Sequence, residues 1–173
     1  MENSQFSESA FEYLLREALL YQPPLQEGID DMDAAQKQSQ RLEEMGYDVG
    51  FRLMERMSEK QKFLGFQDLD CVKFMCRDFW KVLFGKTIDK LQTNRRGVFM
   101  LFDLQFQWIE KYTSGMEMQH LEESTKQMIN TLLSFPCGIM RGGLTNLGMS
   151  VNVTADLGTL PQVTFSLRKK TNS

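Results

Sequence analysis

The sequence predicts an α+β domain in which helices pack on one face of a small antiparallel sheet. Apolar residues recur at helical spacing through most of the chain, and the C-terminal segment alternates with the period of two that is typical of strands. The predicted order is helices, two strands, a helix and two strands, with no linker, repeat or low-complexity tract between them. We therefore expect residues 1–173 to form a single domain.

Two helices are expected in the N-terminal part of the chain, separated by a loop. The first covers about 6–21, where Leu15 and Leu19 belong to an apolar stripe at helical spacing, and Pro23-Pro24 ends it. The stretch 25–40 is polar, with little apolar content. It is therefore expected to be a mobile loop.

The second helix carries apolar side chains on two sides. At about 100° per residue, one stripe spans about 120° of arc, and it contains Leu42, Met45, Val49, Leu53 and Met57. Phe51 and Met54 point to the other side. One core needs only one apolar face, so the surplus indicates a binding partner, with a wholly intramolecular bundle as the alternative.

The segment 68–84 is predicted to be the central helix of the domain. Its apolar residues repeat at alternating steps of three and four, in the order Leu69, Val72, Cys76, Phe79 and Leu83. Further apolar residues widen this stripe and leave only a narrow polar sector. Such a helix is largely buried.

Two short strands, 98–102 and 106–109, are expected to follow and to pair with each other. Helical spacing returns over 126–147, although Pro136 should kink that helix.

Strict alternation in 150–155 and 163–168 predicts a final hairpin with one face in solvent. This hairpin supplies the remaining strands of the predicted sheet.

Composition excludes several classes of protein. The net charge of −3 gives no excess of basic residues for binding nucleic acid, and no run of about 20 apolar residues could span a membrane. The chain starts with neither a basic nor an apolar leader, so we expect a soluble protein that is not secreted. Three cysteines without a CxxC pair favour a reducing compartment, which makes the sequon at Asn152 a chance occurrence.

The sequence offers little catalytic chemistry. His120 is the single histidine, and no GxSxG motif frames a serine. Cys71 and Cys76 lie about 140° apart on their helix and cannot converge on one ion, so they and Cys137 are expected to be buried core thiols. We predict no catalytic residue, no metal and no cofactor, and hence no enzyme.

Gly138 and Gly142 are four residues apart and should form a groove where another backbone approaches closely. Arg141 on the same flank has two interpretations. It is either a solvated side chain or one half of an ion pair across a subunit boundary.

Three segments together resemble the Bet3-related small subunits of the trafficking protein particle (TRAPP) tethering complex. They are 45–53 (MGYDVGFRL), 70–85 (the central helix ending at Gly85) and 137–144 (CGIMRGGL). Residues 69–80 followed by 91–94 (LQTN) are most similar to the branch called subunit 6, or Trs33. The resemblance spans about 6–167 and implies the Bet3-like fold of helices against an antiparallel sheet.

The resemblance also implies a function. It indicates a non-catalytic scaffold subunit of a complex that tethers ER-derived vesicles at the Golgi and supports guanine nucleotide exchange on a Rab GTPase. The chain would pair with the Bet3 subunit through its first two helices and join other small TRAPP subunits. It would contact the Rab only indirectly and the membrane only through the complex, in the cytoplasm at cis-Golgi and ER–Golgi membranes. Whether the isolated chain forms a homodimer is left open.

The partner interface is expected on the two apolar stripes of those helices. Its candidate residues are Leu15, Leu19, Leu42, Met45, Val49 and Leu53.

One segment departs from the Bet3 pattern. Bet3 itself carries an acylated cysteine just before the central helix, whereas this chain has Phe63-Leu64-Gly65-Phe66 there. Apolar side chains are expected to fill the equivalent space, although Cys71 and Cys76 keep acylation open. The alternative function is a small domain of the same fold that binds an acyl chain or lipid, which requires an apolar cavity of about 300 Å³ or more.

Overall fold

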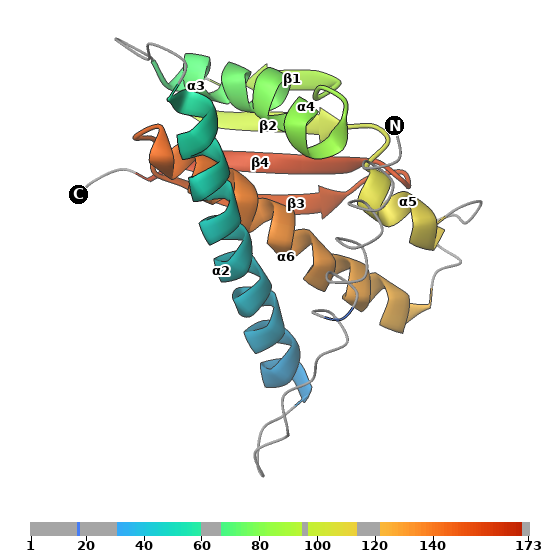
Figure 1. Cartoon of the computed structure of the whole chain (residues 1–173). Coiled ribbons are helices and arrows are strands. Elements are labelled where there is room, and N and C mark those ends of the chain that lie inside the picture. The colour runs from blue at the N-terminus through green and yellow to red at the C-terminus, as the bar shows by residue number, and fades with distance from the viewer. Residues whose placement is uncertain (1–16, 18–30, 60–66, 95–96, 114–121, 171–173) are drawn as a thin grey trace, which may run out of the picture.

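The computed structural model describes residues 17, 31–59, 67–94, 97–113 and 122–170 (Figure 1). The helices are α2 (Asp31–Ser58), α3 (Asp68–Phe74), the π-helical turn η1 (Met75–Phe79), α4 (Trp80–Phe84), α5 (Gln107–Thr113) and α6 (Glu123–Asn146). The strands are β1 (Lys90–Thr93), β2 (Val98–Asp103), β3 (Val151–Leu157) and β4 (Val163–Lys169).

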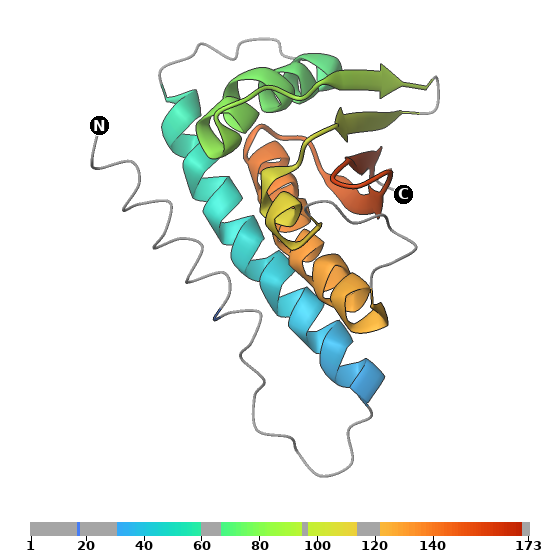
Figure 2. The same cartoon turned by 90° about the vertical axis from the view of Figure 1, so that its right-hand side faces the viewer.

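The strands form one four-stranded antiparallel sheet in the order β1-β2-β4-β3. The C-terminal hairpin is confirmed as β3 and β4, and β4 also pairs with β2 over its whole length. The helices lie together on one side of this sheet (Figure 2). The predicted α+β fold, with helices on one face of a small antiparallel sheet, is therefore confirmed.

Alternation along the strands explains why only one face is covered. Phe99 and Leu101 of β2 and Phe165 of β4 are buried toward the helices. Met100, between Phe99 and Leu101, and Arg168 of β4 are exposed. Successive side chains of a strand point to opposite faces, so one face of the sheet belongs to the core and the other is open.

The predicted central helix is confirmed as the continuous run α3-η1-α4. Its π-helical turn adds a residue to the repeat and shifts the phase of the helix, so that Met75, Phe79 and Trp80 are all fully buried. Trp80 packs edge-on against Phe165 of β4, with ring centroids 5.4 Å apart, and lies 4.4 Å from the ring of Phe84. This helix therefore joins the sheet to the helical layer, as expected for the centre of the domain.

The helices α2 and α6 cross at an angle (Figure 1) and pack closely where Gly46 and Gly50 meet Gly138 and Gly142. Gly46 and Gly50 of α2 face the backbone of α6 at Phe135 and Ile139, and Gly138 and Gly142 of α6 face the backbone of α2 at Glu43 and Tyr47. A Cβ atom on any of these glycines would come within 3.0 Å of a main-chain atom of the other helix. The groove predicted at Gly138 and Gly142 is confirmed, and its occupant is α2 of the same chain.

Residues 106–109 were expected to be a strand, and that prediction is wrong. Phe106, Ile109 and Thr113 are buried, which gives steps of three and four residues. This spacing places all three on one side of α5, and the hydroxyl of Thr113 donates to the carbonyl of Ile109 at 2.9 Å. A four-residue apolar segment does not distinguish the two periods by itself.

Strand β1 was not expected, because its sequence has only one apolar residue. Leu91 is half-buried, whereas Lys90, Gln92 and Thr93 are exposed, so no apolar alternation marks the strand. Its pairing with β2 defines it instead.

The loop and the helix predicted in the N-terminal part of the chain are tested by the structure only in part. Residues 31–40 belong to α2, so the loop expected over 25–40 is wrong there, while 25–30 lie outside the described residues. This stretch is rich in Ala and Gln, which favour a helix without giving it an apolar stripe. The helix expected over 6–21 lies outside the described residues apart from Glu17, which is helical.

Replacing Gly142 by Ala should destabilise the fold strongly. The new methyl group would overlap the carbonyl of Tyr47, and main-chain atoms held by two helices cannot move aside. Overpacking of this kind costs about 3 kcal/mol or more in the free energy of unfolding. Thermal unfolding followed by circular dichroism should show a melting temperature lowered by roughly 10 °C.

Gly143→Ala in the same helix is the matched control. Its new Cβ would meet the terminal methyl group of Met75 at 2.9 Å, and a flexible methionine can give way. An equal loss of stability in both variants would contradict the assigned role of the helix contact.

Candidate partner-binding surface

The surface of α2 divides into a face toward the core and a face toward solvent. Leu42, Gly46, Gly50 and Met54 are buried and follow one another at steps of four. This row lies against α6, so it fixes the rotation of α2 about its own axis. Every other side chain of the helix is oriented by that contact.

Two apolar side chains are consequently held in solvent. Met45 is 48% exposed and Val49 is 44% exposed, and the two are one helical turn apart. Leu53, one turn further on, is half-buried against the core. Met45, Val49 and Leu53 therefore form a continuous apolar strip along α2, which is exposed at Met45 and Val49 and reaches the core at Leu53.

The structure separates the six residues predicted for the interface. Met45 and Val49 are accessible, and Leu53 is accessible in part. Leu42 is only 2% exposed and belongs to the core, so it cannot contact a partner while the chain is folded as described. Leu15 and Leu19 lie outside the described residues.

The opposite margin of α2 is aromatic. Tyr47 and Phe51 stack with ring centroids 6.1 Å apart, and the guanidinium of Arg141 lies 4.6 Å from the centre of the Tyr47 ring. Nε of Arg141 is 2.9 Å from Oε1 of Glu43, which places the ion pair within the chain. Of the two roles considered for Arg141, neither a fully solvated side chain nor a pair across a subunit boundary describes this arrangement.

A buried polar network joins the central helix to the sheet. Asp103 is only 1% exposed, and its carboxylate accepts hydrogen bonds from Nε1 of Trp80 at 2.9 Å, from Nζ of Lys86 at 2.5 Å and from the main-chain N–H of Gln105 at 3.1 Å. A buried carboxylate with this many donors is satisfied. We assign the network a structural role rather than a catalytic one.

Asp89 completes the network. Partial burial raises the pKa of Asp89, but the main-chain N–H of Leu104 and the ammonium of Lys86 outweigh this and hold its pKa below the ordinary value. Partial burial lowers the pKa of Lys86, and its hydrogen bonds to Asp103 and Asp89 more than compensate, so that its pKa is raised. The ion pair between Lys86 and Asp89 therefore persists throughout the neutral range.

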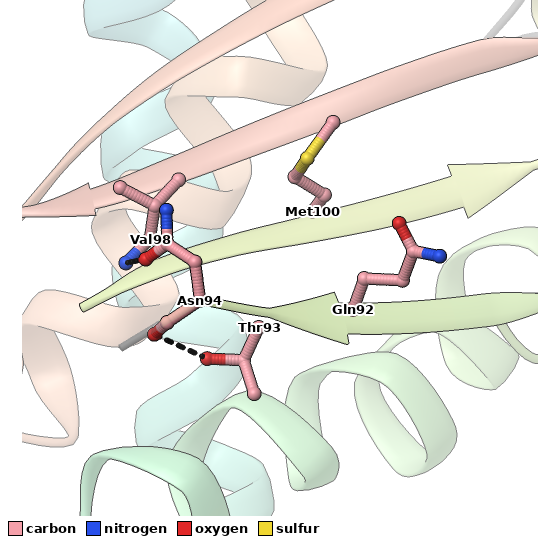
Figure 3. A pocket seen from close by; sticks show the side chains of 5 residues that line it. All are labelled: Gln92, Thr93, Asn94, Val98 and Met100. Atoms are coloured by element: carbon pink, nitrogen blue, oxygen red, sulfur yellow. Dashed lines mark hydrogen bonds between the residues drawn. The ribbon is translucent and has the colours of Figure 1, made fainter. Parts of the chain in front are cut away.

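A hollow of about 380 Å³ lies beside β1 and β2 (Figure 3). Its lining is mixed, with polar Gln92, Thr93 and Asn94 next to apolar Val98 and Met100. It does not have the apolar lining that the lipid-binding alternative requires. Sequence reasoning missed this hollow because it had not predicted β1.

The described part of the chain shows no group of three or more His, Cys, Asp or Glu side chains placed to hold a metal ion. Among the same residues, no helix is both long enough and apolar enough to cross a membrane. His120 lies outside the described residues.

A family model described as transport protein particle (TRAPP) component matches residues 17–172. The chain belongs to this family. Human trafficking protein particle complex subunit 6B is 40% identical over 128 residues, which are 73% of this chain and 75% of that protein. Human subunit 6A is 39% identical over 127 residues, covering 73% and 74%. The resemblance to the subunit 6 branch of the TRAPP family is confirmed.

The fold of this TRAPP component is shared with a solved structure. A trafficking protein particle complex subunit 3 from Naegleria fowleri, covalently bound to palmitic acid, matches with a TM-score of 0.70. The match covers 98% of this chain and 96% of the other, with 19% identity. At that identity the likeness establishes the Bet3-like fold, and the acyl group is a property of the other protein.

The thiols of this TRAPP component are poorly suited to modification. Cys71, Cys76 and Cys137 are all buried. Burial raises the pKa of both Cys76 and Cys137 to about 12, and burial followed by the nearby carboxylates raises the pKa of Cys71. The thiolate is the reactive species, so these cysteines are expected to be inert in the folded chain. Residues 63–66, expected to fill the space of an acyl chain, lie outside the described residues.

Labelling with iodoacetamide at pH 7.5 should distinguish folded from unfolded protein. The folded chain should react at least about 100-fold more slowly, because thiols with a pKa near 12 are almost wholly protonated there. In guanidinium chloride all three cysteines should be modified, as counted by mass spectrometry. Rapid labelling of one thiol in the folded chain would show that it is exposed and reactive.

The pH dependence of stability should reveal the pair between Lys86 and Asp89. Because the folded state lowers the pKa of Asp89, its contribution is present above about pH 4 and is lost as the pH falls through the folded pKa. The Asp89→Asn variant should be less stable than wild type by at most about 1 kcal/mol at pH 7, since solvent screens a partly exposed pair.

Urea unfolding at several pH values measures this difference. The gap between the two proteins should close toward pH 3. A gap that stays constant between pH 7 and pH 3 would mean that the asparagine perturbs packing rather than charge.

Proposed function

We propose that this chain is a non-catalytic scaffold subunit of a TRAPP vesicle-tethering complex that pairs with a Bet3-type subunit. The observation that carries the proposal is the exposure of Met45 and Val49 on α2 in a chain of the TRAPP family. Exposed apolar side chains that adjoin the core are a common feature of protein interfaces. The first helix, expected over 6–21, would contribute the rest of the contact.

The physical features of α2 suit this role. Methionine is flexible and polarisable, so Met45 can adapt to an irregular partner surface. The charged residues around the pair carry both signs, with Arg41 and Arg52 beside Glu44 and Asp48, all of them exposed. An apolar centre with a charged rim is the usual anatomy of a specific interface.

In this proposal the chain positions neighbouring subunits rather than performing exchange itself. The complex would support guanine nucleotide exchange on a Rab GTPase during ER-to-Golgi and Golgi transport, at the cytoplasmic side of cis-Golgi and ER–Golgi membranes. Guanine nucleotide exchange should therefore be absent from the isolated chain. The relatives reported above, which are trafficking subunits, support membership in such a complex.

Mixing the chain with a Bet3-type subunit tests the proposal. Light scattering coupled to size exclusion should show a 1:1 species at micromolar concentration. Two proteins that stay separate under these conditions would refute it.

Replacing Val49 by Asp should weaken this pairing while leaving the chain folded. The new carboxylate would become an unpaired charge in a desolvated contact, at a cost of at least about 2 kcal/mol, or roughly thirtyfold in Kd. In the free chain Val49 is 44% exposed, so the carboxylate stays hydrated and the melting temperature should change little. Isothermal titration calorimetry and thermal unfolding measure the two effects separately.

Two further variants serve as controls, one on the surface and one in the core. Thr154→Asp places the same charge on an exposed position of β3 and should leave pairing unchanged, whereas Leu42→Asp buries the charge in the core and should unfold the chain. If Val49→Asp is folded and pairs as tightly as wild type, the α2 surface is not the interface.

A further inference from the structure

Strand β1 borders the sheet and has no neighbour on its outer side among the described residues (Figure 1). The main-chain N–H of Asn94 donates to the carbonyl of Val98 at 3.0 Å, which marks these two as a hydrogen-bonded pair. Bonded and non-bonded pairs alternate along an antiparallel ladder. The main-chain groups of Leu91 and Thr93 therefore point away from β2, and the described part of the chain provides no partner for them.

Edge strands usually carry features that discourage pairing, such as very short length, a charged side chain, proline or a bulge. β1 has the sequence KLQT, whose one charge, Lys90, lies 5.6 Å from the centre of the Phe102 ring on the neighbouring strand. No bulge interrupts its register with β2. The short length and Lys90 disfavour pairing with a second copy of this edge, whereas neither a proline nor a bulge blocks an extended chain of opposite charge.

The hollow described above lies at the same edge (Figure 3). Gln92 and Met100 rise from paired positions of β1 and β2, and Val98 lies two residues from Met100 on the same face of β2. An added strand would place alternate side chains on this face, next to Gln92. The hollow can then receive one long side chain, with Val98 and Met100 as its apolar wall.

The local charge favours an acidic occupant. Between Lys86 and Asp103 the sequence has four basic residues and two acidic ones, although the whole chain has a net charge of −3. Both of those carboxylates, Asp89 and Asp103, are paired with Lys86. Lys90 is exposed on β1, and Arg168 of β4 is exposed opposite Val98.

We propose that the outer edge of β1 binds an extended segment of a partner protein that carries an acidic and an apolar side chain two residues apart, on the same face of the segment. The segment adds as a fifth strand through the main chain of Leu91 and Thr93. An acidic side chain meets Lys90, and the apolar side chain two residues away enters the hollow beside Gln92. This surface is separate from the one on α2 and does not depend on the function proposed above.

Synthetic nine-residue peptides provide the probe for the full chain. In one set every second position carries Glu or an apolar residue (Val, Leu or Met) in turn, with Ser at the positions between them, so that Glu and the apolar residue share a face. A second set has Lys in place of Glu, and a third has Pro at the central position. The Glu set should bind, the Lys set should bind at least tenfold more weakly, and the Pro set should not bind. Failure of every Glu peptide at 1 mM overturns the proposal.

Thr93→Pro is the decisive variant. It removes an N–H that points outward and leaves the ladder between β1 and β2 intact, and proline is tolerated at such edge positions. Binding of the Glu peptides should fall at least tenfold, whereas Thr93→Val should bind like wild type. Thermal unfolding must show both variants folded, and equal binding by both overturns the proposal.

Amide hydrogen exchange locates the contact even if Thr93→Pro does not fold. In wild-type protein the amides of Leu91 and Thr93 should gain protection when the peptide binds, whereas those of β3 at the other border should not. Protection of β3 alone, or of neither strand, overturns the proposal.

Two other occupants give different results. A dimer of the free chain that is lost in Thr93→Pro means that a second copy pairs at this edge. Binding to phosphatidylserine vesicles that is lost in Lys90→Glu but retained in Thr93→Pro means that the charge serves a membrane. Either result, in the absence of peptide binding, overturns the proposal.

Discussion

The contact between the backbones of α2 and α6 determines much of this structure. Gly46 and Gly50 meet Gly138 and Gly142 at a distance that leaves no room for a Cβ atom. Such a contact has one register and one rotation, because a shift by a single residue would bring a side chain where only a hydrogen fits. The direction in which Met45 and Val49 point is therefore set by the residues of the adjoining buried face of their helix.

The second constraint is the polar network between the central helix and Asp103, at the end of β2. Asp103 accepts from Trp80 of the central helix and from Lys86, and Lys86 also pairs with Asp89 immediately before β1. Removing one partner would leave a buried charge without compensation, which is strongly unfavourable. The network thus fixes where β1 begins and keeps this short, polar strand at the border of the sheet.

The elements that the sequence predicted well are those in which burial repeats along the segment. The second helix from about Leu42, the central helix and the C-terminal hairpin all carry such a repeat, and the small pair Gly138 and Gly142 indicated the helix contact. Residues 31–40 and β1 lack an apolar repeat, so their structure depends on helix propensity in one case and on a neighbouring strand in the other.

The candidate surface was predicted only in part, for a geometric reason. A helical wheel assigns Leu42 and Val49 to one stripe, since they are about 20° apart at 100° per residue. The wheel does not show how much of the surface of α2 is covered by α6. In the structure that boundary falls between them, so Leu42 is buried and Val49 is exposed.

A scaffold must hold its partners in fixed relative positions, and the arrangement of constraints in this chain meets that requirement. The exposed face of α2 is tied to α6 by main-chain contact, and the edge of β1 is tied to the central helix by the Asp103 network. The central helix in turn packs on the sheet through Trp80 and Phe165. Because each surface is anchored to the same core by contacts that tolerate little displacement, binding at one surface can orient a second partner without any conformational change between them.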